Sequence, residues 1–180
     1  PKSDDPAFHH ARWWTILSNK TATNAAADAA MRENFLVEVD NSCDDWDYAP
    51  AADYLLNRLQ ELRKKSEKVC LISGGEVTVK VSDGGVGGRN QQFALACAEK
   101  IKGQKIAVLS AGTDGIDGNS TAAGAIADGT TVQRAQDKGL DIQSALARFD
   151  AFPLFESLGD AIITGPTGNN VRDIRILIAM

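Results

Sequence analysis

The amino-acid sequence predicts an α/β fold, with a mixed, mostly parallel sheet and helices on its faces. Short apolar runs such as 69–72 and 106–111 have the length and composition of buried strands, and alanine-rich or amphipathic stretches lie between several of them. Glycine, serine, threonine and aspartate follow these runs directly. Ligands of open α/β sheets bind where strands end, so the fold class also predicts where a site lies.

Composition excludes several classes of protein. The 180 residues are 43% apolar and 24% charged, which is ordinary for a globular protein. A net charge of −5 argues against nucleic-acid binding, and no apolar run approaches the ~20 residues that span a membrane. The first residues lack the pattern of a secretory signal, and the three cysteines form no CxxC pair, so neither a disulfide framework nor a zinc ribbon is indicated. A cytoplasmic location is the simplest interpretation.

The first third of the chain predicts two strands and two helices. A loop over 1–12 precedes a strand over 13–17, and the alanine-dense stretch 21–31 favours a helix. A strand over 35–39 follows, and apolar residues at helical spacing predict a helix over 51–65. The acidic side chains of the loop between them are interpreted as a solvated surface rather than a magnesium site. They are Asp40, Asp44, Asp45 and Asp47.

The centre and end of the chain complete the order of elements. Valine alternates with polar residues over 77–81, which predicts a half-exposed strand forming a hairpin with 69–72. A glycine-rich loop leads into a helix near residue 89, and the strand 106–111 follows. Further helices are expected over 121–135, 142–149 and 151–158, and further strands over 161–164 and 171–179. This order favours a three-layer α/β/α, Rossmann-like architecture.

The loop GGVGGRNQQ is a candidate anion-binding site. Its four glycines allow the backbone to approach a phosphate or carboxylate, and the start of the following helix adds partial positive charge. Arg89 adds a planar guanidinium suited to bidentate contact. The loop matches neither the dinucleotide motif GxGxxG nor a Walker A sequence. We favour this functional interpretation over a flexible hairpin with a surface arginine.

Two other turns allow a ligand-binding and a capping interpretation. The stretch IAVLSAGTDGIDGNS places Asp114 and Asp117 in a glycine-rich turn at the end of a strand. Such carboxylates orient a ligand or a cation, or they cap the next helix, and the sequence leaves both open. Ser18 and Asn19 pose the same choice before an earlier helix, where capping is preferred to anion binding.

Long segments resemble the carboxyl-terminal MOFRL domain of the type-2 glycerate kinases, some of which have the older label hydroxypyruvate reductase. The matching segments are SGGEVTV, GGRNQQFAL, AGTDGIDG with TAAGAIADG, and TGPTGNNVRDIRI. The resemblance covers nearly the whole chain from about residue 13. It divides the chain into 1–66, the end of a preceding amino-terminal domain with a connecting segment, and 67–180, the MOFRL-like domain. Val77, Gln92 and Asn169 depart from the residues common in the family.

The resemblance implies phosphorylation of glycerate at its 2-hydroxyl, with ATP and Mg²⁺. The site is then expected in a cleft shared with a missing amino-terminal domain, so the isolated fragment is expected to be inactive. Arg89, Asp114 and Asp117 are the expected catalytic residues, and no metal ligand is assigned with certainty. The expected contacts to substrate or phosphate are Ser73, Gly74, Gly75, Glu76, Asn90, Gly112, Thr113, Thr167, Gly168, Asn169, Asn170, Ser18 and Asn19.

Two alternative functions stay open on the sequence. The first is an NAD(P)H-dependent hydroxypyruvate reductase, against which no GxGxxG follows a strand in this chain. The second is a domain without chemistry of its own that binds a small acidic ligand or assembles with a partner chain. The enantiomer of glycerate, the general base, the nucleotide preference and assembly into a homo-oligomer are not defined by the sequence.

Overall fold

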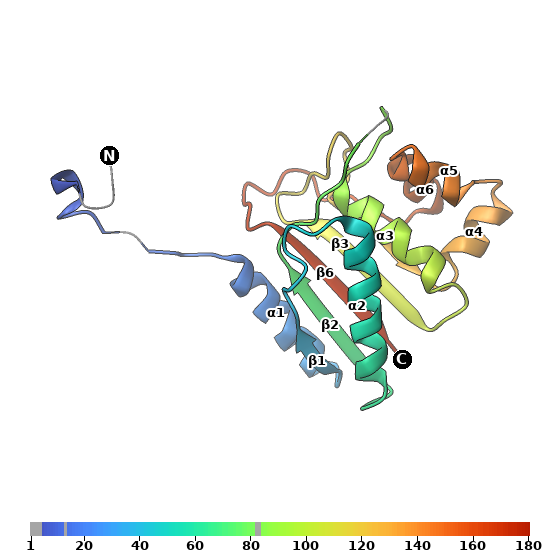
Figure 1. The fold of residues 1–180 in the computed structure, drawn as a ribbon, viewed down its shortest axis with the longest axis horizontal. Coiled ribbons are helices and arrows are strands. Elements are labelled where there is room, and N and C mark those ends of the chain that lie inside the picture. Colours follow the sequence, from blue (N-terminus) through green and yellow to red (C-terminus); the bar gives the residue numbers. More distant parts are fainter. Residues whose placement is uncertain (1–4, 13, 82–83) are drawn as a thin grey trace.

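The computed structural model describes residues 5–12, 14–81 and 84–180, and it has one six-stranded sheet at its centre (Figure 1). The strands lie in the order β1-β2-β6-β3-β4-β5. They are β1 (Leu36–Val39), β2 (Val69–Gly74), β3 (Ile106–Gly112), β4 (Gly124–Asp128), β5 (Ala161–Ile162) and β6 (Asp173–Ala179). The predicted mixed sheet with flanking helices is confirmed.

The pairing of the strands corrects one part of this prediction. Among the described strands, β1 and β2 form the one parallel pair, and the other four pairs are antiparallel. The expected mostly parallel pairing is therefore wrong, although β1, β2, β3 and β5 all point the same way. The cause is β6, which enters the centre of the sheet from the end of the chain and separates β2 from β3. A central apolar strand has the same sequence pattern whether it runs parallel or antiparallel to its neighbours. The position and direction of β6 could therefore not be predicted from composition.

The helices form two unequal layers. They are α1 (Asn19–Arg32), α2 (Tyr48–Arg63), α3 (Arg89–Lys100), α4 (Thr131–Asp137), α5 (Ile142–Ala147) and α6 (Ala151–Leu158), with a 3₁₀ turn η1 (Pro6–Phe8) before them. Helices α2 and α3 cover one face of the sheet, and α4 to α6 extend that layer beside α3 (Figure 1). On the opposite face, α1 packs over β1, β2 and β6.

Alternation along the strands divides the core between the two faces. On β2, Leu71 faces α2 and α3, where it lies in one apolar cluster with Phe93. Its neighbour Ile72 faces α1, where it packs with Ala27. Burying each large apolar side chain contributes about 1.5–3 kcal/mol, so both layers hold the sheet in place. No helix within residues 5–12, 14–81 and 84–180 has the length and apolar character needed to cross a membrane.

Two predicted elements are replaced by others. The segment 77–81 does not fold back on β2, because β1 and β6 occupy both edges of that strand. Instead, Thr78 pairs with the loop before α2, where its N–H donates to Trp46 O at 2.7 Å. The segment 121–135 is not one helix but β4 followed by α4. Alanine favours a helix, yet here small residues are needed, since a Cβ at Gly124 would lie 1.9 Å from Ser110 O on β3.

The amino-terminal part of the chain differs from its prediction at one strand. Within the predicted strand 13–17, Trp13 lies outside the described residues, and 14–17 form no strand. The strand and helices predicted from 21 to 65 are present as α1, β1 and α2, which pack on the same sheet as the rest. The domain boundary after residue 66 stays a prediction.

Candidate functional site

The glycine-rich loops meet at one edge of the sheet. Strands β2 and β3 end there, and β6 begins there, with Asp173 opposite Gly112 in the strand register. Helix α1 also begins at this edge, where the Asn19 side chain donates to the main-chain oxygens of Val171 and Asp173 at 2.8 and 2.9 Å. The structure thus brings these separate segments together, and their use as one site stays a prediction.

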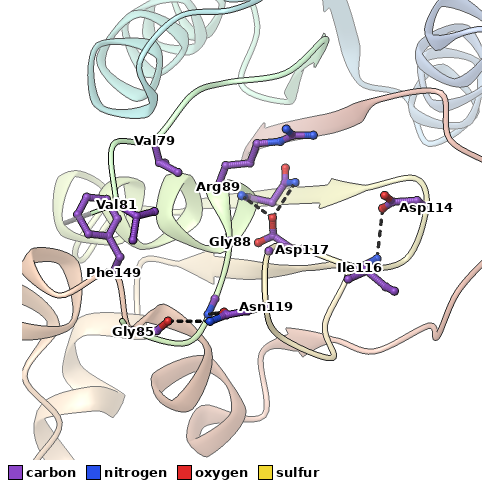
Figure 2. Close-up of a pocket in the computed structure, with 13 residues that line it drawn as sticks. Val79, Val81, Gly85, Gly88, Arg89, Asp114, Ile116, Asp117, Asn119 and Phe149 are labelled. Atoms are coloured by element: carbon purple, nitrogen blue, oxygen red, sulfur yellow. Dashed lines mark hydrogen bonds between the residues drawn. The ribbon is translucent and has the colours of Figure 1, made fainter. Parts of the chain in front are cut away.

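A cleft of about 560 Å³ opens beside this edge (Figure 2). Its walls come from the segment between β2 and α3, the loop after β3, and Phe149 between α5 and α6. Four of the predicted site residues line it, namely Arg89, Asn90, Asp114 and Asp117. The cleft therefore brings together the arginine and the two aspartates that the sequence singled out.

Arg89, the first residue of α3, is held by the protein's own carboxylates. Its Nε and Nη2 donate to Asp173 at 2.6 and 3.0 Å, and Nη2 also lies 2.9 Å from Glu76 Oε1. The Asp173 side chain is only 2% exposed. The hydrogen bonds from Arg89 to Asp173 raise the pKa of the arginine, and Glu76 adds to this effect. The Nε–Nη2 edge is thus occupied, and no described residue bonds to Nη1, which leaves that edge for a ligand.

A second ion pair fixes the residue before Asp173. Arg172 has a φ of 71°, a left-handed conformation that is strained for a residue with a long side chain. Its guanidinium bonds to both oxygens of Asp44 at 2.7 and 2.6 Å, and its carbonyl accepts from Thr113 Oγ1 at 2.7 Å. Asp44 also accepts the N–H of Glu76 at 2.9 Å. These contacts tie the start of β6 to both neighbouring loops. The prediction that Asp44 lies on a merely solvated surface is therefore wrong.

Asp117 is turned inward, toward the start of α3. One carboxylate oxygen accepts from the main chain and side chain of Asn90 at 3.1 and 3.2 Å, and the other from those of Gln91 at 2.9 and 3.0 Å. Gly88, the residue before α3, has no side chain to cap the helix, and a Cβ there would lie 2.3 Å from Asp117 Oδ1. Burial raises the pKa of Asp117, against the lowering effect of these bonds. The geometry is that of a helix cap supplied from a distant loop.

Asp114 is the carboxylate of this loop with room for a ligand. Its Oδ1 accepts the N–H of Ile116 at 3.2 Å, and Oδ2 bonds to no residue that the structure describes (Figure 2). Within the described residues, no three His, Cys, Asp or Glu side chains gather in a way that could hold a metal ion. Mg²⁺ is commonly bound through one or two carboxylates, with phosphate oxygens and waters as the other ligands. Asp114 fits that mode, not a cage made of protein side chains alone.

The main chain of the predicted loops is largely engaged within the protein. The N–H of Gly74 donates to Asn41 Oδ1 at 2.7 Å, and the N–H of Gly112 donates to Ala123 O at 2.8 Å. The carbonyls of Gly74 and Gly75 accept from Arg175 Nη2 at 2.9 and 3.0 Å. These two N–H groups are therefore not available to an anion, and the carbonyls help to shape the edge.

The remaining predicted residues hold loops together. Ser18 Oγ accepts the N–H of Thr21 at 3.3 Å, so it caps α1, as preferred from the sequence. Thr167 Oγ1 donates to Thr113 O at 2.6 Å and joins the last loop to the loop after β3. The exposed turn beyond it is made by Gly168, Asn169 and Asn170. Contacts of these residues, and of the buried Ser73, with substrate stay a prediction.

Several residues of this edge were not predicted from the sequence. Asp173 and Arg175 alternate along β6 and are both buried on the face of α2 and α3, with Arg175 at 0% exposure. Burial lowers the pKa of Arg175, and its Nε and Nη1 have no partner in the described part of the chain. The alternation in DIRILIA was the available signal, since charged residues on the buried face of a strand need a partner or a function.

The sequence of this chain is similar to those of known proteins. The model of the MOFRL family matches residues 69–173. The chain is 33% identical to a glycerate 2-kinase of Pyrococcus horikoshii over 98% of this chain and 41% of that protein. It is 35% identical to a D-glycerate 2-kinase of Thermotoga maritima over 84% of this chain and 37% of that protein. A protein of Agrobacterium vitis named for hydroxypyruvate reductase is 44% identical over 60% of this chain and 29% of its own length.

Solved structures show the same fold. The crystal structure of a Thermotoga maritima glycerate kinase superposes with a TM-score of 0.85 at 33% identity, over 91% of this chain and 41% of that one. The crystal structure of a Pyrococcus horikoshii protein gives a TM-score of 0.86 at 32% identity, over 94% of this chain and 40% of that one. The chain thus spans about two fifths of the length of these relatives. Because the family model matches more than half of its residues, the chain belongs to the MOFRL family.

Proposed function

We propose that this chain is the carboxyl-terminal part of a glycerate 2-kinase, which phosphorylates glycerate at the 2-hydroxyl with ATP and Mg²⁺. The observation that supports this best is the cleft itself, where the Nη1 edge of Arg89 and the Oδ2 of Asp114 are open to a ligand. Membership of the MOFRL family and the names of the P. horikoshii and T. maritima relatives agree with it.

The residues of the cleft would act by positioning and by neutralising charge, which phosphoryl transfer requires more than covalent chemistry. Arg89 would contact the substrate carboxylate or the transferred phosphoryl group through Nη1. Asp173 and Glu76 would act as positioning residues for Arg89, and Asp117 would position the start of α3. Asp114 is the residue that would bind Mg²⁺, which supplies charge neutralisation at the phosphate oxygens when bound.

The rest of the site would come from a part of the enzyme outside this chain. The relatives are more than twice as long, and in the proposed enzyme an amino-terminal domain closes the cleft over glycerate and ATP. The isolated chain is accordingly expected to show no turnover. Its cytoplasmic location and any homo-oligomer stay predictions.

The test is phosphorus NMR of the complete enzyme with glycerate, ATP and Mg²⁺. A 2-phosphoglycerate signal is expected, and Arg89→Ala should reduce turnover by about 100-fold or more, as loss of a group that stabilises transition-state charge does. Arg32→Ala, at the exposed end of α1, is the matched control and should retain turnover within about twofold. Absence of a phosphoester in the wild type, or near-normal turnover of Arg89→Ala, would overturn the proposal.

A reductase is the second candidate, favoured by the name of the A. vitis relative. It requires a nicotinamide site, and no GxGxxG motif occurs in this chain. Oxidation of NAD(P)H by the complete enzyme with hydroxypyruvate, in the absence of any phosphoester product with ATP, would establish this alternative instead.

A further inference from the structure

The cleft has a charged end and an apolar end. Arg89 and Asp114 lie at the charged end, whereas Val79, Val81 and Phe149 lie together at the other end (Figure 2). The Val81 side chain is 63% exposed, so the wall is apolar surface facing water. Clefts of about 300–1,000 Å³ accommodate drug-sized ligands, and a cavity of about 560 Å³ is much larger than glycerate requires.

The apolar end is built rigidly. Phe149 has a φ of 54°, a strained conformation for an aromatic residue, and its ring lies at 75° to that of Tyr48 with centroids 6.4 Å apart. Strain of this kind persists only where the surroundings hold the residue, and Phe149 lines the cleft. The apolar end is therefore preformed around an aromatic ring.

The glycine loop is fastened to both sides of this end. The N–H of Val86 donates to Asp150 Oδ1 at 2.9 Å, and the N–H of Gly87 donates to Asn119 Oδ1 at 2.9 Å. Gly85 lies so close to the chain at Phe149 that a Cβ there would be 2.4 Å from Phe149 O. These contacts keep Phe149 and residues 85–87 at a fixed separation.

We propose that Val79, Val81 and Phe149 bind the nucleobase of the phosphoryl donor, so that the nucleoside end of the nucleotide is bound by this chain. The proposal rests on the proposed kinase function, since it takes the nucleotide from that reaction. A nucleotide matches the two ends of the cleft, because its planar base is apolar on both faces and its phosphates are anionic. The base would stack beside Phe149, and the phosphates would extend toward Asp114 and Arg89.

Valine-methyl NMR of the complete enzyme tests the placement directly. Adding adenosine, or a non-hydrolysable ATP analogue with Mg²⁺, should shift the methyl signals of Val79 and Val81 through the ring current of the base. Val39, on the edge strand β1 outside the cleft, provides the control signal. Unchanged Val79 and Val81 signals at millimolar ligand would overturn the proposal.

Kinetics of the complete enzyme separate this proposal from the kinase function. Val81→Ala removes part of an exposed apolar wall without a risk to folding, and it should raise the KM for ATP by about 3- to 10-fold with the KM for glycerate unchanged. Val39→Ala should leave both constants unchanged. A rise in the KM for glycerate alone would assign the apolar end to the acid and overturn the proposal. If no phosphoester forms but adenosine shifts Val79 and Val81, the nucleobase site stands and the kinase function fails.

Discussion

Replacing Asp117 by asparagine should destabilise the fold rather than remove a group from the chemistry. The carboxylate accepts four hydrogen bonds from Asn90 and Gln91, two of them from main-chain N–H groups at the start of α3. Asp117 is only 2% exposed, so these donors have no access to water. Asparagine has nearly the same shape, but it offers one oxygen and one NH₂ group in place of two oxygens.

The magnitude follows from the donors that lose their acceptor. The remaining oxygen of asparagine can accept from two of the four N–H groups, and its NH₂ then faces the other two. Each buried donor without an acceptor costs about 1–3 kcal/mol, and removal of a buried charge offsets part of this. We expect Asp117→Asn to lower the free energy of unfolding by about 2–4 kcal/mol, which corresponds to a fall in Tm of roughly 5–15 °C for a chain of this size.

Urea unfolding followed by circular dichroism measures the effect. Asp114→Asn is the matched control, because that carboxylate accepts one N–H at 3.2 Å and should change stability by less than about 1 kcal/mol. Because the pKa of Asp117 is raised in the folded chain, the contribution of Asp117 to stability declines as the pH rises from about 3.8 through the raised pKa. The difference in free energy of unfolding between wild type and Asp117→Asn should therefore become smaller over that pH range. An Asp117→Asn chain as stable as wild type, with turnover of the complete enzyme abolished, would refute the capping role and make Asp117 a ligand-contacting residue.

Three further perturbations test other parts of this edge. Asp44→Asn should remove stability that is present above pH 3.8 and is lost as the pH falls through the lowered pKa of Asp44. Burial alone would raise this pKa, but the hydrogen bonds from Glu76 and Arg172 outweigh that effect. Acid unfolding curves of the variant that coincide with those of the wild type would contradict this. Gly85→Ala should lower the free energy of unfolding measured in urea by about 1–3 kcal/mol, since the new Cβ would lie 2.3 Å from a main-chain oxygen. The control Gly84→Ala places its Cβ where nothing lies within 4 Å and should leave stability unchanged. Equal effects of the two substitutions would show that the loop is not packed as described. The native chain should not react with a thiol reagent at pH 8, because its three cysteines are buried and burial raises the pKa of Cys43 to about 11. All three cysteines should react in urea. Fast reaction of the folded chain would show that a thiol is accessible.

The sequence predicted the helices better than the strand pairing. Apolar residues at helical spacing located α2. Local patterns do not contain the information that β6 enters between β2 and β3, because that choice depends on which strand edges are free in three dimensions. The segment 77–81 was misassigned for the same reason, since its alternation fits a strand but both edges of β2 were taken.

The candidate site was predicted as a set of loops but not as a set of contacts. The sequence singled out the glycine-rich segments that contain Arg89 and Asp114, and both residues line one cleft of the structure. Nothing local distinguishes Asp114 from Asp117, three residues later in the same turn, although one faces the cleft and the other caps α3. Likewise, the partner of Arg89 is Asp173, 84 residues away, and only the insertion of β6 brings them together.

The charges at this edge constrain what the cleft can bind. Arg89 is accompanied by four carboxylates, those of Glu76, Asp114, Asp117 and Asp173, and two of them bond to it directly. Its charge is therefore largely balanced within the protein, and an unaccompanied polyphosphate would meet net negative charge. A bound divalent cation would offset this excess of negative charge, since Asp114 and the phosphates would then both be ligands of the cation. In the proposed kinase, this arrangement would favour a phosphate ligand that arrives with Mg²⁺ over free phosphate or free nucleotide, with Arg89 as one fixed donor within an acidic cleft.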